Sequence, residues 1–210
     1  MTIHILQLPL GPLQTNCFIV GDDETKSAVV IDPGGDAPHV LAALDRRGWQ
    51  LKYILLTHAH FDHVGAVADL IDATRAPLAI HPLELPLLRH GGGAQEFGFH
   101  LRPCPEPDVL LQEGQVVEVG GLRFQVLFTP GHTVGHVAFY AAQAKAVFSG
   151  DVLFQDGIGR TDFPGGSYET LMRSIREALF ALPDETAVCP GHGPVTTIGR
   201  ERAENPFLAD

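Results

Sequence analysis

The sequence has few cysteines, few basic residues and no long apolar run, and each shortage excludes a class of protein. Its 210 residues include three cysteines, Cys17, Cys104 and Cys189, without a Cys-x-x-Cys pair. We therefore expect reduced thiols and a cytoplasmic location. No stretch approaches the roughly 18 apolar residues of a membrane helix. The first nine residues also lack the basic start of a signal peptide.

Positive charge is scarce as well. Lys and Arg number 14 against 25 Asp and Glu, for a net charge of −11, and no more than two basic residues are adjacent. A nucleic-acid partner is disfavoured, because phosphate binding requires concentrated positive charge. With 45% hydrophobic residues, the chain is long enough to bury one core. We expect a single domain spanning residues 1–210.

The segment Thr57–His63 has the densest set of metal-binding side chains. Its three histidines and one aspartate directly follow the apolar run Tyr53–Leu56, which predicts a buried strand. Imidazole and carboxylate suit zinc or iron. Donors this close in sequence cannot all reach one ion without strain, so two neighbouring ions fit better. A solvated polar turn would explain a single histidine, but four donors in six residues argue against it.

The motif His58-Ala-His60-Phe-Asp62-His63 resembles the His-x-His-x-Asp-His motif of the metallo-β-lactamase superfamily. That family adds a histidine, an aspartate and a final histidine, each at a strand end, and the chain offers matches in the same order. The resemblance implies two groups of three ligands joined by a bridging carboxylate. The first group is His58, His60 and His132, the second is Asp62, His63 and His192, and the bridge is Asp151.

The same resemblance implies hydrolytic chemistry with two divalent metal ions. We expect zinc, with iron or manganese as alternatives, because the same donors accept all three. Zinc lowers the pKa of bound water to about 7, so a bridging hydroxide would attack a carbonyl carbon. The catalytic residues would be Asp62, which orients the hydroxide and accepts its proton, and the bridging Asp151. No Gly-x-Ser-x-Gly nucleophile motif is present.

Alternating apolar runs and amphipathic stretches predict an α/β protein. Helices are expected after Asp36, across Val64–Ile71 and from Ser167 to Leu182. The first strand is expected to end before Pro9, and Gly120-Gly121 predicts a tight hairpin. The resemblance extends this to a four-layer αβ/βα sandwich, with two mixed sheets flanked by helices. The expected strands include Ile3–Leu8, Asn16–Val20, Ala28–Ile31, Val116–Val119, Leu122–Thr129, His136–Ala141 and Ala146–Phe148.

Three further features leave alternatives open. Asp32 either supports the metal site by hydrogen bonding or simply forms a turn. His136 enters an apolar strand, which favours a structural or hydrogen-bonding role over direct ligation. The Gly- and Pro-rich stretch 91–107 is either a substrate lid or an ordinary loop.

The loop Phe154–Pro164 resembles that of the glyoxalase II branch, the hydroxyacylglutathione hydrolases. The resemblance implies a small-molecule thioester as substrate, with Arg160 replacing the usual lysine as a substrate-binding cation and Phe163 as a displaced aromatic. Only 18 residues follow His192, where larger members add a helical domain. The resemblance is therefore to the short, single-domain type, and glutathione as the thiol carrier stays open.

Other functions remain as alternatives. Persulfide dioxygenases resemble the chain in the run Gly159–Phe163, and one iron would then be held by His58, His132 and Asp151. A β-lactamase is less favoured, because secreted lactamases carry a signal sequence and commonly have cysteine where Asp151 stands. A nuclease fits the motif but not the charge. The acyl group and the oligomeric state stay open.

Overall fold

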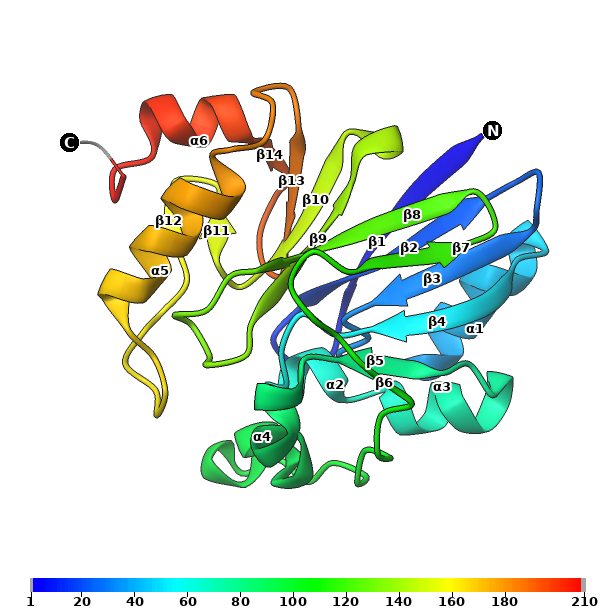
Figure 1. Ribbon diagram of the computed structural model, residues 1–210. Coiled ribbons are helices and arrows are strands. Elements are labelled where there is room, and N and C mark those ends of the chain that lie inside the picture. Colours follow the sequence, from blue (N-terminus) through cyan, green and yellow to red (C-terminus); the bar gives the residue numbers. More distant parts are fainter. Residues whose placement is uncertain (1, 209–210) are drawn as a thin grey trace.

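Two six-stranded sheets form the centre of the protein, seen in a computed structural model that describes residues 2–208 (Figure 1). The first sheet has the order β1-β2-β3-β4-β5-β6, and the second has the order β14-β13-β10-β9-β8-β7. Both sheets are mixed. Strands β3 to β6 run parallel in the first, β10 and β13 run parallel in the second, and the remaining pairs are antiparallel.

The strands are short, and several follow one another directly along the chain. The first sheet consists of β1 (Ile3–Leu10), β2 (Thr15–Asp22), β3 (Ser27–Ile31), β4 (Gln50–Leu55), β5 (Leu78–Ile80) and β6 (Val109–Leu110). The second consists of β7 (Val116–Val119), β8 (Leu122–Phe128), β9 (Val137–Ala141), β10 (Ala146–Gly150), β13 (Ala187–Pro190) and β14 (Thr196–Thr197). A separate hairpin pairs β11 (Leu153–Phe154) with β12 (Gly157–Ile158).

The helices are α1 (Ala37–Arg47), α2 (Phe61–Val64), α3 (Val67–Thr74), α4 (Leu85–Arg89), α5 (Tyr168–Ser174) and α6 (Ile198–Glu204), with a π-helical turn η4 (Ile175–Leu179) and 3₁₀ turns η1 (Pro82–Glu84), η2 (Gly91–Phe97) and η3 (Ala142–Ala144). The longer helices α1, α3, α5 and α6 lie on the outer faces of the two sheets, whereas η3 packs against the core between them. Residues 2–208 contain no helix with the length and apolar character that crossing a bilayer requires.

Three hydrophobic cores hold the layers together. The central core lies between the sheets, where Phe18 and Ile31 of the first sheet meet Phe124 and Phe148 of the second. One outer core packs α1 and α3 on the first sheet, and the other packs α5, η4 and α6 on the second (Figure 1). Helix, sheet, sheet and helix therefore form four layers, which confirms the predicted αβ/βα sandwich.

Most local predictions hold, and the differences have packing causes. Ser167 caps α5 by accepting a hydrogen bond from the Thr170 amide, and the Gly120-Gly121 hairpin joins β7 to β8. Strand β1 continues through Pro9, because it is an edge strand of its sheet and proline is tolerated at an edge. The helix expected over Val64–Ile71 is two helices, α2 and α3, interrupted at Gly65 and Ala66.

The helix expected from Ser167 to Leu182 also differs from the prediction. It is α-helical to Ser174, and a π-helical turn continues it to Leu179. Asp36 does precede α1, but its side chain makes no capping bond within the helix, since the residue adopts a left-handed conformation.

Gly34 and Gly65 allow two turns to meet beside the polar cluster. A Cβ atom at Gly34 would overlap the carbonyl oxygen of Asp62, and one at Gly65 would overlap the carbonyl oxygen of Gly34. The turn after β3 and the short helix α2 can therefore pack backbone to backbone. This contact fixes the position of the Asp62 and His63 side chains.

We expect Gly34→Ala to lower the melting temperature, since the new methyl group requires a backbone shift, and overpacking of this kind costs about 1–3 kcal/mol. Gly157→Ala is the matched control, because its Cβ atom would make only ordinary contacts, the nearest at 3.7 Å. Thermal unfolding followed by circular dichroism compares the two. Equal melting temperatures would contradict the close backbone packing.

Candidate metal centre

Strand ends from both sheets meet at one edge of the sandwich and carry the seven predicted ligands there. His58 and His60 follow β4, and Asp62 and His63 lie in α2. From the second sheet, the loops after β8, β10 and β13 supply His132, Asp151 and His192. Parallel strands β10 and β13 are in register at Gly150 and Pro190, so the residues that follow them are neighbours.

The first three histidines form one group. The ring nitrogens of His58, His60 and His132 lie within 4.8 Å of one another. The His132 ring is oriented by a hydrogen bond from its Nδ1 to the Arg160 carbonyl oxygen at 2.8 Å, and the His58 Nδ1 lies 3.0 Å from the Thr57 hydroxyl. These bonds leave the Nε2 atoms of both rings directed toward the shared space.

Asp62, His63 and His192 form the second group, whose donor atoms also lie within 4.8 Å of one another. The Asp62 carboxylate lies 3.1 Å from His192 Nε2 and 3.6 Å from His63 Nε2. The Thr15 hydroxyl donates to Asp62 at 2.8 Å and fixes the rotation of the carboxylate.

Asp151 lies between the two groups. One oxygen is 3.4 Å from His63 Nε2, and the other is 3.7 Å from His132 Nε2 and 3.5 Å from His192 Nε2. The structure therefore brings together all seven residues that the sequence motifs identified, in the predicted grouping.

The donor atoms themselves indicate what the centre holds. Within residues 2–208, the buried atoms His58 Nε2, His63 Nε2 and Asp151 Oδ1 have no hydrogen-bond partner. A buried polar atom without a partner costs about 1–3 kcal/mol. Imidazole nitrogen and carboxylate oxygen are the donors that zinc, iron and manganese accept, so divalent cations would supply the missing partners. The residues fit a dinuclear metal site.

Metal binding requires neutral histidine and ionised carboxylate. His58, His60 and the two aspartates meet this requirement, whereas Asp151 and Asp32 raise the pKa of His63 against burial, so His63 must lose a proton when it binds an ion. Burial lowers the pKa of His58 well below its usual value and that of His60 to about 3. Burial opposes ionisation of Asp62, but a hydrogen bond from His192 and the charge of His63 outweigh it and lower its pKa to about 2. The pKa of Asp151 is likewise lowered, against burial, by His63.

Asp32 and His136, whose roles the sequence leaves undecided, form hydrogen bonds around the centre. Asp32 accepts from the Thr57 amide at 2.8 Å and its hydroxyl at 2.6 Å, and its carboxylate lies 3.0 Å from His63 Nδ1. It therefore orients a ligand ring as well as a turn. His136 Nε2 accepts from the Asp151 amide at 3.2 Å, and its Nδ1 meets the Thr129 hydroxyl at 2.9 Å. Both nitrogens of His136 are thus engaged away from the ligand groups.

Glu84 is a supporting residue that the sequence did not reveal. Its side chain is 1% exposed, and its two carboxylate oxygens accept from the Ala59 amide at 2.9 Å and the Gly135 amide at 2.8 Å. Ala59 stands between His58 and His60, and Gly135 follows His132. Glu84 therefore clamps together the two loops that form the first group. The only sequence signal was a lone carboxylate among apolar residues.

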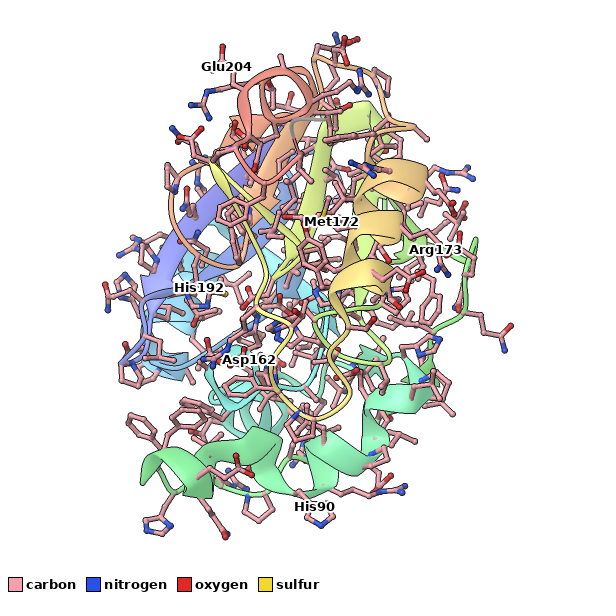
Figure 2. All side chains as sticks on the ribbon, turned by 90° about the vertical axis from the view of Figure 1, so that its left-hand side faces the viewer. His90, Asp162, Met172, Arg173, His192 and Glu204 are labelled. Atoms are coloured by element: carbon pink, nitrogen blue, oxygen red, sulfur yellow. The ribbon has the colours of Figure 1, made fainter. Side chains whose placement is uncertain are left out.

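A cavity of about 560 Å³ opens onto the centre, with His60, Asp62, His132, Asp151 and His192 at its floor. Figure 2 faces this side of the molecule, where His192 and Asp162 lie near the middle above the helical segments α4 and η2. Gly92 of η2 packs directly on the Phe61 backbone. The stretch from Gly91 to Phe97 thus forms a packed wall of the cavity, within the segment 91–107 for which the sequence leaves a lid and an ordinary loop as alternatives.

Arg160 lines the same cavity, next to Phe163, as a substrate-binding residue would. Its Nε and Nη2 atoms donate to the two oxygens of Asp162, each at 2.7 Å. The guanidinium group also lies over the Phe163 ring, 3.7 Å from its centre. Arg160 is therefore held in place, with its charge balanced by a neighbour.

We expect Glu84→Gln to weaken metal binding by about tenfold, because the amide group cannot accept from both backbone N–H groups and the two loops lose their clamp. The control is Glu201→Gln, which alters another fully buried carboxylate, at the start of α6. Both variants should unfold at lower temperature, but only Glu84→Gln should change metal affinity measured by competition with a chelator. Equal affinities in the two variants would rule out the clamp.

The chain matches known proteins along most of its length. The family model described as metallo-beta-lactamase superfamily matches residues 10–192. Hydroxyacylglutathione hydrolase GloC of Haemophilus influenzae is 43% identical over 99% of this chain and 98% of its own. The structure of the BLEG-1 B3 metallo-beta-lactamase superposes with a TM-score of 0.93 at 42% identity, covering 99% of this chain and all of that one. The di-iron-bound structure of TTHA1623 gives a TM-score of 0.88 at 46% identity, covering 97% and 100%. With its seven donors and its four-layer fold, the chain belongs to the metallo-beta-lactamase superfamily.

Proposed function

We propose that the protein is a glyoxalase II-like hydrolase that cleaves small-molecule thioesters. The observation that carries the proposal is the pair of three-donor groups, sharing Asp151, at the floor of an open cavity. The similarity to GloC, named as a hydroxyacylglutathione hydrolase, supports the thioester. We propose zinc as the metal, with iron or manganese as alternatives, and the di-iron-bound TTHA1623 structure is a reason to test iron.

When bound, two divalent ions supply an acidic water and polarise a carbonyl group. The chain supplies the rest. His58, His60 and His132 would hold one ion, and His63 and His192, with Asp62, would hold the other. The ionised carboxylate of Asp62, held by the Thr15 hydroxyl, accepts a proton from the attacking water. That proton then reaches the departing sulfur, so thioester and water become a carboxylic acid and a thiol.

Two other activities have observations in their favour. The run Gly159–Phe163, which resembles persulfide dioxygenases, lies beside the centre, and its Arg160 and Phe163 line the cavity. The similarity to BLEG-1, named as a metallo-beta-lactamase, makes hydrolysis of a lactam amide a candidate activity. The persulfide reaction would need one iron at His58, His132 and Asp151, whereas lactam hydrolysis would use both donor groups, so the metal count and the substrate distinguish these activities.

One assay panel separates these functions. Protein loaded with zinc, iron or manganese is given lactoylglutathione, a persulfide with dissolved oxygen, or a chromogenic cephalosporin. We expect thioester cleavage that stops on chelation and returns with metal, because the buried donors require a cation. Oxygen uptake with the persulfide, or turnover of the cephalosporin alone, would contradict the proposed thioester hydrolysis.

We propose that Arg160 contacts the substrate through the N–H groups that Asp162 leaves unused. Arg160→Ala should raise KM for a thioester of an anionic thiol by about two- to fivefold, a small effect because the charge is already balanced. KM for a thioester of a neutral thiol should change less. Arg173→Ala, which removes an exposed arginine paired with Glu169 on α5, is the control. Equal changes for both substrates would remove Arg160 from the binding site.

A further inference from the structure

The cavity walls above the centre are apolar and come from widely separated segments. Two of the wall side chains are large and half exposed, Leu13 at 48% and Phe97 at 50%. Apolar surface left facing a cavity gains stability when a ligand covers it. The apolar residues that line the cavity include Leu13, Phe61, Phe97, Phe154, Ile158 and Phe163.

The aromatic rings among them are fixed by one another. Phe61 stacks on Phe99 with ring centres 5.1 Å apart, and Phe97 lies 5.5 Å from Phe61 and 5.9 Å from Phe163. Phe163 is covered in turn by the Arg160 guanidinium. These contacts hold the rings in place before any substrate arrives. The aromatic wall, defined as Phe61, Phe97 and Phe163, is therefore preformed.

Few charged side chains line the walls of the cavity. Among the described residues that line the cavity, the charged side chains beyond the donor groups are Arg160 and Glu96. Arg160 forms a two-point ion pair with Asp162, and this hydrogen bonding lowers the pKa of Asp162 to about 2, so the pair stays ionised. Glu96 would repel a carboxylate. A glutathione thioester brings two carboxylates and an ammonium group, and against these three charges the walls formed by residues 2–208 offer only Glu96 and an Arg160 already paired with Asp162.

We propose that the enzyme selects thioesters that carry an uncharged apolar group, aliphatic or aromatic, which packs on the aromatic wall beside the reacting carbonyl. This inference rests on the proposed thioester hydrolysis and names its substrate class. Glutathione thioesters are then cleaved slowly, because their three charges lose water and gain at most the weak partners Arg160 and Glu96.

Substrate length gives the first test. The metal-loaded enzyme is assayed on acetyl and hexanoyl thioesters of N-acetylcysteamine, on the acetyl thioester of hexanethiol, and on lactoylglutathione. A buried methylene is worth about three- to fourfold, so one of the six-carbon substrates should exceed acetyl-N-acetylcysteamine in kcat/KM by at least about tenfold. The position of the chain in that substrate shows which half of the thioester meets the wall. Equal values across the series, or the highest value for lactoylglutathione, would overturn the inference.

Changes at Phe97 test the wall itself. Phe97→Ala should reduce the ratio of kcat/KM for the preferred six-carbon substrate to that for the acetyl substrate by about three- to tenfold, since part of the covered surface is lost. Phe97→Arg should reduce the same ratio and raise kcat/KM for lactoylglutathione. Phe207→Ala is the matched control, because Phe207 is 52% exposed and lines another surface, beside α5. A ratio that stays the same in the Phe97 variants would show that the wall does not contact the substrate.

Binding without turnover separates this inference from the proposed function. Calorimetry on the metal-loaded protein compares the S-hexyl and S-methyl thioethers of N-acetylcysteamine with S-methylglutathione, none of which can be hydrolysed. The S-hexyl compound should bind at least about tenfold more tightly than the S-methyl compound. If no thioester is cleaved but this preference holds, the reaction is wrong and the apolar site stands. If thioesters are cleaved but the preference is absent, the apolar site is wrong.

Discussion

Seven ionisable side chains can lie this close together only if something balances their charges and satisfies their buried atoms. Burial, together with repulsion from neighbouring imidazoles, keeps His58 and His60 neutral, and nearby imidazoles keep Asp62 and Asp151 ionised. Several donor atoms still have no protein partner within residues 2–208. Divalent cations would supply these missing partners. The hydrogen bonds between the surrounding loops hold the donor atoms close enough together to bind them.

The sandwich supplies the rigidity that this arrangement requires. The parallel pair β10 and β13 delivers Asp151 and His192 side by side, and Glu84 fastens the loop after β4 to the loop after β8. The wall of the cavity has its own support. The side chains of Glu201 and Asn205, at the end of the chain, hold the hairpin of β11 and β12 through the Asp156 amide at 2.9 Å and the Gly157 carbonyl oxygen at 3.1 Å.

The sequence predicted well the features that depend on residue type and spacing. The strand-end motifs identified the donors, and Ser167 marked the start of α5 because its cap is local. It predicted poorly the features set by tertiary neighbours. Pro9 stays within β1 because no strand lies beyond that edge, and Gly65 interrupts a helix because another backbone passes close by. Glu84 could not be recognised, since its partners are backbone amides, which every sequence contains.

The reaction space has two contrasting halves. Its floor is polar and suited to cations, while its walls are aromatic and aliphatic, with Arg160 already paired to Asp162. The donors come from strand ends and α2, whereas most of the walls come from η2, the β11–β12 hairpin, the loop after it and the loop before β2. Phe61, in α2 next to Asp62, is the wall residue that shares an element with the donors. The rest of the walls can therefore change substrate without replacing a metal ligand.

The central claim is that two neighbouring cations occupy the space between the donor groups. Anomalous diffraction at the metal absorption edge, from crystals of the metal-loaded protein, tests it most directly. The account predicts two peaks about 3.5–4 Å apart, one beside His58, His60 and His132 and the other beside Asp62, His63 and His192, with Asp151 contacting both. A single peak, or peaks away from these side chains, would contradict it.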